Sequence, residues 1–287
     1  MQDQKPVVLI TGCSAGGIGY ALCEAWSPHA STVYATSRRL SSMSPFPTGN
    51  IKVLELDVSS EESVVAAVEE VLRAEGRVDV AVSNAGGMSV GPILDADLQE
   101  IQRSFDTNVF GMHRLARAVI PGMIERKHGL FVVVSSITAL VPGPWHGIYS
   151  AGKAALLNYA ETLDMECRPL GVRVQTLIPG AVRSRISTNE MLRWPGLSPT
   201  SPWAPWESAV RARITFSQQE GVSMDTREFA DRAVVGMRRK WGWRALGARV
   251  LGGGGSLIYW VLSCLPRSWA LAVVWWNQGG TLEVKRA

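Results

Sequence analysis

A strand, a glycine-rich turn and a helix follow one another directly at the start of the chain. An apolar run at residues 6–10 meets a turn with glycines at positions 12, 17 and 19, and a helical pattern opens at once. Gly12, Gly17 and Gly19 permit a tight turn and a close approach of the main chain to a pyrophosphate, which the helix N-terminus stabilises. The loop alone also fits an ordinary strand–helix connection. With a strand before it and a helix after it, it predicts dinucleotide binding.

Five further apolar runs have the length of strands and alternate with helical stretches. They cover residues 32–37, 51–57, 78–83, 130–135 and 172–178, and a helix at residues 60–75 begins with Ser59 or Ser60 as its cap. This alternation of strands and helices predicts an α/β fold of the Rossmann type, a doubly wound parallel sheet of about seven strands flanked by helices. We expect one catalytic domain over residues 1–250, with a helical lid at residues 185–225, and an apolar tail at residues 251–287.

The second strand ends in Ser37, Arg38 and Arg39, where nicotinamide-binding folds usually have an acidic residue against the adenosine ribose. A guanidinium matches a phosphate in charge and in forked geometry, so this strand end favours NADP(H) over NAD(H). A solvated surface position fits Arg39 better than Arg38. The third strand closes with Asp57 and Val58, which puts a carboxylate where an adenine amino group could lie.

Tyr149 and Lys153 are four residues apart, which places them one turn apart on the same face of a helix. A nearby ammonium stabilises a phenolate, so a phenol with an ordinary pKa of about 10 can exchange protons near neutrality. Ser136 lies thirteen residues before Tyr149, and its hydroxyl can hold a substrate oxygen beside the phenol. The pair alone is weak evidence. Behind the glycine loop it predicts an acid/base device for a carbonyl or an alcohol.

The chain resembles the short-chain dehydrogenase/reductase family over residues 6 to about 185, where six of its motifs occur in order. They are the glycine loop, Leu56-Asp57-Val58, Asn84-Ala85-Gly86, Asn108, the set Ser136, Tyr149 and Lys153, and Pro179-Gly180. Within the family the chain looks like a fungal branch with 1-acyldihydroxyacetone-phosphate reductase and 17-beta-hydroxysteroid dehydrogenase-like enzymes. This second resemblance rests on the residues of the glycine loop, on Arg38-Arg39-Leu40 and on the lipophilic tail.

The resemblance implies roles for individual residues. Tyr149 would be the general acid in reduction and the general base in oxidation, and Lys153 would lower its pKa and bind the nicotinamide ribose. Ser136, rather than Ser135, would orient the substrate oxygen, and Asn108 would hold a water that connects Lys153 to solvent. The cofactor residues that it implies are Gly12, Ser14, Gly17, Ile18, Gly19, Ser37, Arg38, Arg39, Asp57, Val58, Asn84, Ala85, Gly86, Tyr149, Lys153, Pro179, Gly180, Val182 and Ser184.

Two positions depart from the family's pattern. The glycine loop carries one residue more than the commonest spacing, so both Gly16 and Gly17 are candidates for the phosphate contact. Ser184 stands where the family often has a threonine against the carboxamide, and it keeps the hydroxyl.

Two classes of function fit these residues. The first is an NADPH-dependent reductase or reversible dehydrogenase of a lipophilic substrate: an acyl-dihydroxyacetone phosphate, a steroid-like ketone or a secondary-metabolite intermediate. The second is a non-redox member of the fold, a cyclase or an NADP(H)-binding regulator, which would be expected to lose part of the Ser–Tyr–Lys set. Because Ser136, Tyr149 and Lys153 are all present, we favour the first. Hydride transfer needs no metal, and the four histidines have no ligand spacing.

Composition narrows the setting. Four cysteines without paired or metal-like spacing indicate a reducing compartment and no disulfides. A formal charge of +4 is too mild to suggest nucleic-acid binding, and the first ten residues enter the sheet without a signal peptide. We therefore expect a cytoplasmic protein, peripheral on the endoplasmic reticulum or a lipid droplet if its tail binds lipid. The family resemblance implies a homo-oligomer.

The second half of the chain changes character. Nine of the eleven tryptophans lie beyond Met191, and in the family this stretch forms a mobile substrate lid. Aromatic side chains there suit a large apolar ligand, although a rigid surface loop with inward-packed tryptophans is the alternative. Arg183, Arg185 and Arg193 could meet a substrate phosphate or be surface charges. His146 fits a partly exposed loop residue better than a pocket residue.

The tail admits three arrangements. Residues 257–276 have the length of a membrane span, but Arg267 lies near the middle of the segment beside a proline. Tryptophan-rich apolar segments with basic neighbours lie in the membrane interface, which favours peripheral contact over a span. Packing on the body or on another subunit is the third arrangement. The glycines at 252–255 predict a flexible break before the tail.

Overall fold

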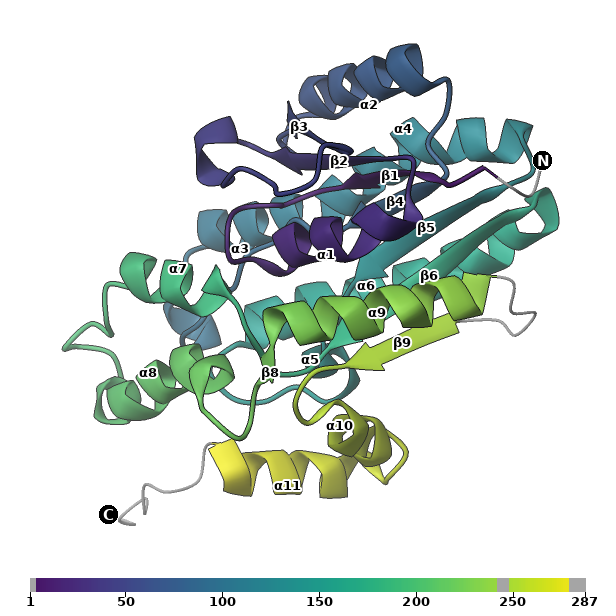
Figure 1. The fold of residues 1–287 in the computed structure, drawn as a ribbon. Coiled ribbons are helices and arrows are strands. Elements are labelled where there is room, and N and C mark those ends of the chain that lie inside the picture. The colour runs from purple at the N-terminus through teal and green to yellow at the C-terminus, as the bar shows by residue number, and fades with distance from the viewer. Residues whose placement is uncertain (1–3, 242–247, 279–287) are drawn as a thin grey trace.

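A seven-stranded sheet lies between two layers of helices in the computed structural model, which describes residues 4–241 and 248–278 (Figure 1). The strand order is β3-β2-β1-β4-β5-β6-β9 and every pairing is parallel. The strands are β1 (Val7–Ile10), β2 (Thr32–Ser37), β3 (Ile51–Glu55), β4 (Val80–Ser83), β5 (Gly129–Val134), β6 (Val172–Pro179) and β9 (Ala248–Gly252). The predicted doubly wound parallel sheet is confirmed.

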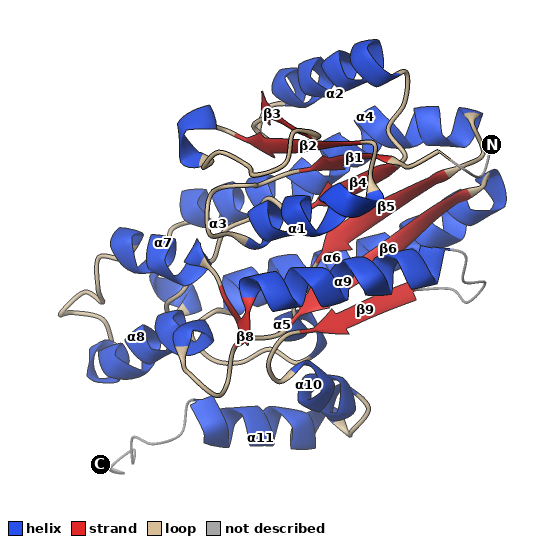
Figure 2. Cartoon of the chain, viewed as in Figure 1, coloured by secondary structure: helices blue, strands red, loops and turns tan. Residues whose placement is uncertain are grey.

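Apolar side chains on both faces of the sheet explain the two helix layers (Figure 2). Helices α1 (Ile18–Trp26) and α9 (Thr226–Trp241) cover one face, where Trp26 and Phe229 are fully buried. The other face packs against α2 (Glu61–Glu75), α4 (Gly111–Glu125) and α6 (Gly147–Cys167). Because β1, β4 and β5 are covered on both sides, they are continuous apolar runs without alternation.

Several element ends differ from the predicted ones. β3 ends at Glu55, two residues before Asp57, and α2 begins after Ser60, whose hydroxyl accepts a hydrogen bond from the Ser63 N–H at 3.1 Å. The helical segment around Asn108 consists of α3 (Leu98–Phe105), a π-helical turn at Asp106–Phe110, and α4. Such turns inside helices are frequent at functional sites.

The lid contains two helices, α7 (Arg185–Arg193) and α8 (Glu207–Thr215), and the short strands β7 (Val182–Arg183) and β8 (Met224–Asp225). Helix α8 ends at Thr215, and the chain continues as a 3-10 turn at Phe216–Gln218. Val210 and Ile214 of α8 are fully buried against Val90, and Trp145 and Trp194 pack on the same cluster. Trp194 therefore packs inward, as the alternative for the lid expects.

The tail packs on the body with one face of its two helices, α10 (Ser256–Ser263) and α11 (Arg267–Gln278), at the lower edge of Figure 1. Tyr259, Leu262 and Val274 are buried against a cluster around Ile178, and Nη1 of Arg267 donates a hydrogen bond to the Leu140 carbonyl at 2.9 Å. No helix in the described residues is long and apolar enough to cross a membrane. Residues 279–287 of the tail lie outside the described residues.

The glycine run before the tail forms a close crossing of two backbone segments, so the predicted flexible break is wrong. The Ala181 N–H donates to the Gly254 carbonyl at 2.8 Å, and the Gly180 N–H donates to the Gly252 carbonyl at 2.7 Å. A Cβ on Gly254 would lie 1.7 Å from the Val222 carbonyl oxygen. Gly254 is needed because there is no room for a side chain at its position, whereas Gly255 has open space around it and a φ of +73°. β9 also extends across residue 250, where the sequence suggested that the tail begins.

Candidate active site

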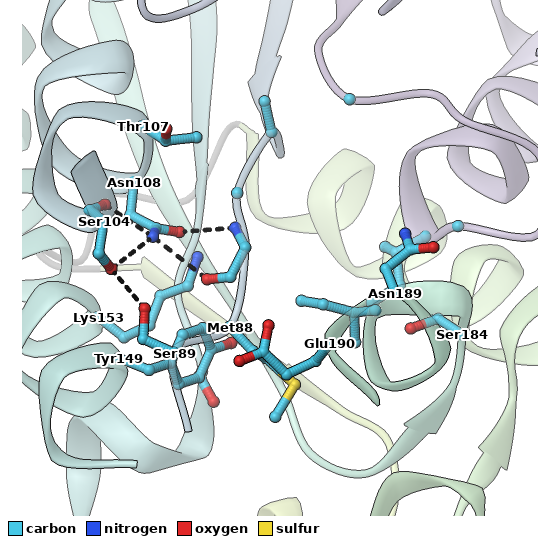
Figure 3. A pocket seen from close by; sticks show the side chains of 18 of the residues that line it. Met88, Ser89, Ser104, Thr107, Asn108, Tyr149, Lys153, Ser184, Asn189 and Glu190 are labelled. Atoms are coloured by element: carbon cyan, nitrogen blue, oxygen red, sulfur yellow. Dashed lines mark hydrogen bonds between the residues drawn. The ribbon is translucent and has the colours of Figure 1, made fainter. Parts of the chain in front are cut away.

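A cavity of about 750 Å³ lies at the carboxyl ends of β1, β4, β5 and β6, between the sheet and the lid. In open parallel sheets ligands bind at this edge, where the strand order changes direction. Figure 3 shows Asn108, Tyr149 and Lys153 on one wall of the pocket and Ser184, Asn189 and Glu190 on the facing wall. The residues of the first wall come from α6 and from the π-helical turn at Asp106–Phe110, and those of the second belong to α7 of the lid or directly precede it.

Three predicted catalytic side chains meet in this cavity. Tyr149 and Lys153 lie in the first two turns of α6, and the Lys153 ammonium is 5.7 Å from the centre of the Tyr149 ring. Ser136 follows β5 and hydrogen-bonds the Tyr149 hydroxyl. Ser135, by contrast, donates to the Lys153 carbonyl at 2.8 Å and so braces α6. This division of the two serines agrees with the choice of Ser136 for the substrate oxygen.

The protonation of the phenol differs from the expectation. Burial raises the pKa of Tyr149, while the hydrogen bond with Ser136 and the charge of Arg213 lower it, and no lowering by Lys153 is found. Lys153 Nζ donates to the Val134 carbonyl at 2.9 Å, and burial lowers its own pKa to about 8. The phenol therefore holds its proton, which is the form that can give a proton to a carbonyl oxygen.

Asn108 lies in the π-helical turn and ties the α3–α4 helix to the loop after β4 (Figure 3). Its Oδ1 accepts from the Gly87 N–H at 3.2 Å, and its Nδ2 donates to the carbonyls of Gly87 at 3.2 Å and Ser104 at 2.8 Å. These bonds fix the loop beside Lys153. The water expected between Asn108 and Lys153 stays a prediction.

The glycine loop borders the cavity at the start of α1. Gly17 caps this helix and lines the cavity with Ile18, whereas a Cβ on Gly16 would face Arg185 instead, so Gly17 is the better placed for a phosphate. A Cβ on Gly19 would lie 2.5 Å from the Gly12 carbonyl oxygen, so Gly19 serves close packing beneath the loop. Gly12, Ser14, Asn84, Ala85 and Gly86 also line the cavity.

The end of β2 presents the two arginines differently. Ser37 and Arg38 line the cavity, and the Ser37 hydroxyl lies 2.7 Å from that of Ser42. Arg39 is exposed outside the cavity, as its alternative assignment expects. Asp57 is also outside the lining, because its Oδ1 accepts hydrogen bonds from the Ser59 N–H and hydroxyl; its neighbour Val58 lines the cavity.

The predicted nicotinamide end is formed by residues after β6. Pro179, Gly180, Val182 and Ser184 all line the cavity. A Cβ on Gly180 would lie 2.1 Å from the Gly254 carbonyl oxygen, so this glycine is required by the backbone crossing as well.

His146 and Arg213 form a hydrogen-bonded pair in the cavity wall. His146 is only 1% exposed, so its assignment as a partly exposed loop residue is wrong; the entry to α6 turns it inward. Arg213 was not among the predicted site residues, and its Nη2 lies 2.8 Å from His146 Nε2. A signal was present: Arg213 follows Val210 by three residues and precedes Ile214, so it lies on the apolar face of α8.

The arginines predicted near the lid have other surroundings. Arg183 lies 3.9 Å from Asp225 outside the cavity, and Arg193 lies 3.9 Å from Glu190 at its rim. Arg185 packs its side chain over Gly16 and donates its N–H to the Gly16 carbonyl at 3.2 Å. Arg185 thus lies closer to the glycine loop than it does to the catalytic side chains.

Comparison with known proteins gives a consistent result. A family model described as short chain dehydrogenase matches residues 6–193. The short-chain dehydrogenase ptmH of Penicillium ochrochloron is 34% identical over 267 residues, 92% of this chain and 94% of that protein. The NADPH-dependent 1-acyldihydroxyacetone phosphate reductase of Schizosaccharomyces pombe is 35% identical over 190 residues, 66% of this chain and 64% of that protein. A short-chain dehydrogenase structure from Streptomyces avermitilis has a TM-score of 0.77 and 30% identity, covering 96% of this chain and 97% of that one.

Proposed function

This chain belongs to the short-chain dehydrogenase family, whose members are oxidoreductases acting on hydroxyl and carbonyl groups, and we propose that it is an NADPH-dependent reductase of a lipophilic carbonyl compound. The observation that carries the proposal is the meeting of Ser136, Tyr149 and Lys153 in one cavity with the glycine loop. The sequence resemblance to this family is thereby confirmed, while cofactor preference and substrate are the proposed parts.

The residues around α1 and β2 fit a phosphorylated nicotinamide cofactor. Gly17 caps α1 without a side-chain hydrogen bond and the first turn has no acidic residue, so free N–H groups and the helix dipole suit a pyrophosphate. Arg38 at the cavity edge supplies a fork for a ribose phosphate. Ser37 and Ser14 add hydroxyls at the same edge.

In the proposed reaction the bound nicotinamide supplies the hydride. Tyr149 gives its proton to the carbonyl oxygen, and Ser136 holds the same oxygen by a hydrogen bond. The buried Lys153 cation stabilises the charge that develops on Tyr149 as the proton leaves. Apart from the hydride, these steps use only side chains that line the same cavity.

Apolar side chains of the lid support a lipophilic substrate. Ile186, Trp194, Ile214 and Phe216 line the cavity from the lid, and Met88 lines it from the loop after β4. Trp203 and Trp206 lie outside the lining, so the aromatic contribution of the lid to the cavity comes from Trp194 and Phe216.

NADPH oxidation followed at 340 nm tests the proposal with a panel of lipophilic ketones, including acyl-dihydroxyacetone phosphates and steroid ketones. We expect turnover on one class, with NADPH preferred to NADH. Tight NADPH binding without NADPH oxidation on any ketone of the panel would favour the non-redox alternative.

The outer face of the tail supports peripheral contact with a lipid surface. Trp269 is 64% exposed and Trp276 is 74% exposed, and Leu257 and Ile258 are exposed as well. Exposed tryptophans beside aliphatic side chains suit the membrane interface, so the enzyme would be cytoplasmic and dock on the endoplasmic reticulum or a lipid droplet. Vesicle flotation tests this: changing Trp269 and Trp276 to Gln should abolish flotation, and unchanged flotation would refute the contact.

A homo-oligomer through α4 and α6 is the proposed assembly. Phe110 at the start of α4 and Met165 near the end of α6 are each 52% exposed, although both are large and apolar. Light scattering should show that the wild type is a multimer, and Phe110→Glu should shift the equilibrium toward the monomer. A wild-type monomer at micromolar concentration would rule this assembly out.

A further inference from the structure

We infer that Arg213 forms an anion subsite beside Tyr149, and that the substrate carries an oxyanion such as a carboxylate or a phosphate close to its reactive carbonyl. The subsite is a property of the cavity, and only the position of the carbonyl rests on the proposed function. Four observations lead to it.

The first observation is the placement of Arg213. It lines the cavity from α8, where Val210 and Ile214 on the same face are fully buried and anchor the helix. Its guanidinium lies 5.2 Å from the centre of the Phe216 ring. Packing on an aromatic ring restricts the orientation of the fork, which prepares it for a ligand.

The second observation is the neutrality of its hydrogen-bond partner. Arg213 Nη2 lies 2.8 Å from His146 Nε2, and because a guanidinium only donates, Nε2 accepts and carries no proton. Nδ1 lies 2.8 Å from the Pro144 carbonyl and 3.2 Å from Arg213 Nε, and the shorter contact, with the carbonyl, places the proton on Nδ1. Burial and the Arg213 charge lower the pKa of His146 to about 3. The imidazole is therefore neutral and orients the cation without cancelling its charge.

The third observation is an unmatched donor. Nη1 of Arg213 is buried and has no hydrogen-bond partner. A buried donor without a partner is uncommon and needs an explanation; because Arg213 lines the cavity, a ligand bound there would supply the missing acceptor. Because a guanidinium offers parallel N–H donors, the group that matches it best is an oxyanion.

The fourth observation concerns the acidic side chains of the cavity. Three acidic residues line the cavity: Glu100 is exposed, Glu190 accepts from the Val90 N–H at 3.2 Å and lies 3.9 Å from Arg193, and Asp106 pairs with Arg114 at 2.7 Å. Within residues 4–241 and 248–278, no ion pair includes Arg213. Burying a cation without a counter-charge is costly, and a bound anion would offset that cost.

The position of the subsite follows from the contact with His146. His146 directly precedes α6, Tyr149 lies in the first turn of that helix, and Tyr149 and Arg213 both line the cavity, so the two groups face the same part of it. The charge of Arg213 accordingly lowers the pKa of the Tyr149 phenol. An oxyanion on Arg213 therefore lies only a few bonds from the carbonyl that Tyr149 protonates. The lipophilic part of the substrate is left for the wall with Met88 and Trp194.

Calorimetric titration of the full chain with octanoate, octyl phosphate and octan-1-ol tests the subsite without needing turnover. We expect at least one anion to bind about tenfold or more tightly than the alcohol, since hydrogen bonds to charged groups contribute about 1.5–3 kcal/mol. Arg213→Met should remove this advantage and leave octan-1-ol binding within about twofold. The stronger of the two anions identifies the chemical source of the oxyanion.

Arg211→Met is the matched control, because Arg211 lies on the same helix, pairs with Glu207 at 3.1 Å and is outside the cavity lining. It should leave anion binding unchanged. Arg213→Lys keeps the charge without the fork and should bind the anions with intermediate affinity. Thermal melts check folding, and Arg213→Gln replaces Arg213→Met if that protein does not fold.

Equal binding of anions and alcohol by the wild type would overturn the subsite, as would equal losses for both in Arg213→Met. Anion selectivity without NADPH oxidation on any ketone would contradict the proposed reductase and keep the subsite. Turnover of neutral ketones without anion selectivity would contradict the subsite and keep the proposed reductase.

Discussion

The cofactor side and the lid side of the cavity are built from different kinds of structure. On the cofactor side, strand ends and the start of α1 present main-chain groups and short side chains, held by Asn84, which donates to the Thr11 carbonyl at 2.8 Å. On the lid side, helix α8 presents Arg213 and Ile214, whose places depend on packing against distant segments. The first side is fixed by local spacing, and the second by tertiary contacts.

The two sides also differ in the surroundings of their arginine side chains. Arg38 on the cofactor side is exposed to solvent, whereas Arg213 on the lid side has a buried donor without a partner. An exposed cation attracts a phosphate at little cost, but a buried one discriminates strongly because its desolvation must be offset. The cofactor side therefore suits a common ligand, and the lid side suits selection of a particular substrate.

The largest effect that would sharpen this comparison is expected for Lys153→Met. We predict a loss of about 100- to 10,000-fold in kcat, because the buried ammonium stabilises the charge on Tyr149 during proton transfer. Lys52→Met, which removes an ammonium paired with Glu75 at the surface, is the control and should keep full activity. Wild-type kcat in Lys153→Met would remove the ammonium from the chemistry.

A smaller effect is expected for Arg38→Asp. The ratio of kcat/KM for NADPH to that for NADH should fall about 10- to 100-fold, because a charge-assisted contact of about 1.5–3 kcal/mol is lost. Arg39→Asp changes the same charge outside the cavity lining and should leave the ratio nearly unchanged. Equal effects of the two changes would mean that general charge, and not a contact of Arg38, sets the preference.

A comparison of Gly12→Ala with Gly76→Ala separates the effect of the glycine-loop geometry on NADPH binding from the effect of backbone strain on stability. Both residues have φ of +74°, so each alanine costs about 1–2 kcal/mol, but only at position 12 would the Cβ lie 2.7 Å from the Ala85 Cα. We predict lower melting temperatures for both and about tenfold weaker NADPH binding for Gly12→Ala alone. NADPH binding that weakens equally in both would show that the loop geometry is not what binds the cofactor.

A graded effect is expected from pH, small just above pH 8 and larger at higher pH. Because burial lowers the pKa of Lys153 to about 8, its cation is present below that pH and is lost as the pH rises through it. The reduction rate should therefore fall up to about tenfold per pH unit above 8, while Tyr149, with its raised pKa, keeps its proton. In Lys153→Arg this fall should be absent. A wild-type profile that stays flat to pH 10 contradicts the assignment.

Sequence patterns predicted the parts of the site that depend on short spacings. Tyr149 and Lys153 are one helical turn apart, and Ser136 follows a strand, so the fold brings them together as expected. Asp57 could not be placed from the pattern, because its carboxylate is taken by the local turn at Ser59. The tail was also undecided, because a helix with one buried and one exposed apolar face resembles an interfacial helix in sequence.

His146 and Arg213 show the limit of such patterns. They are 67 positions apart in the chain, and their contact exists only because α8 packs over the start of α6. A charged residue on an apolar helix face was the one local sign of it. No motif specifies the partner, so the lid side had to be read from the structure.

The most direct test of the central claim measures Tyr149→Phe with two readouts, NADPH affinity and ketone reduction at 340 nm. The change removes one hydroxyl and leaves the ring, so the predicted result is an NADPH Kd within about twofold of wild type and a loss in kcat of about 100-fold or more. Reduction at the wild-type rate, with the same Kd, would contradict the account by showing that the proton comes from another group.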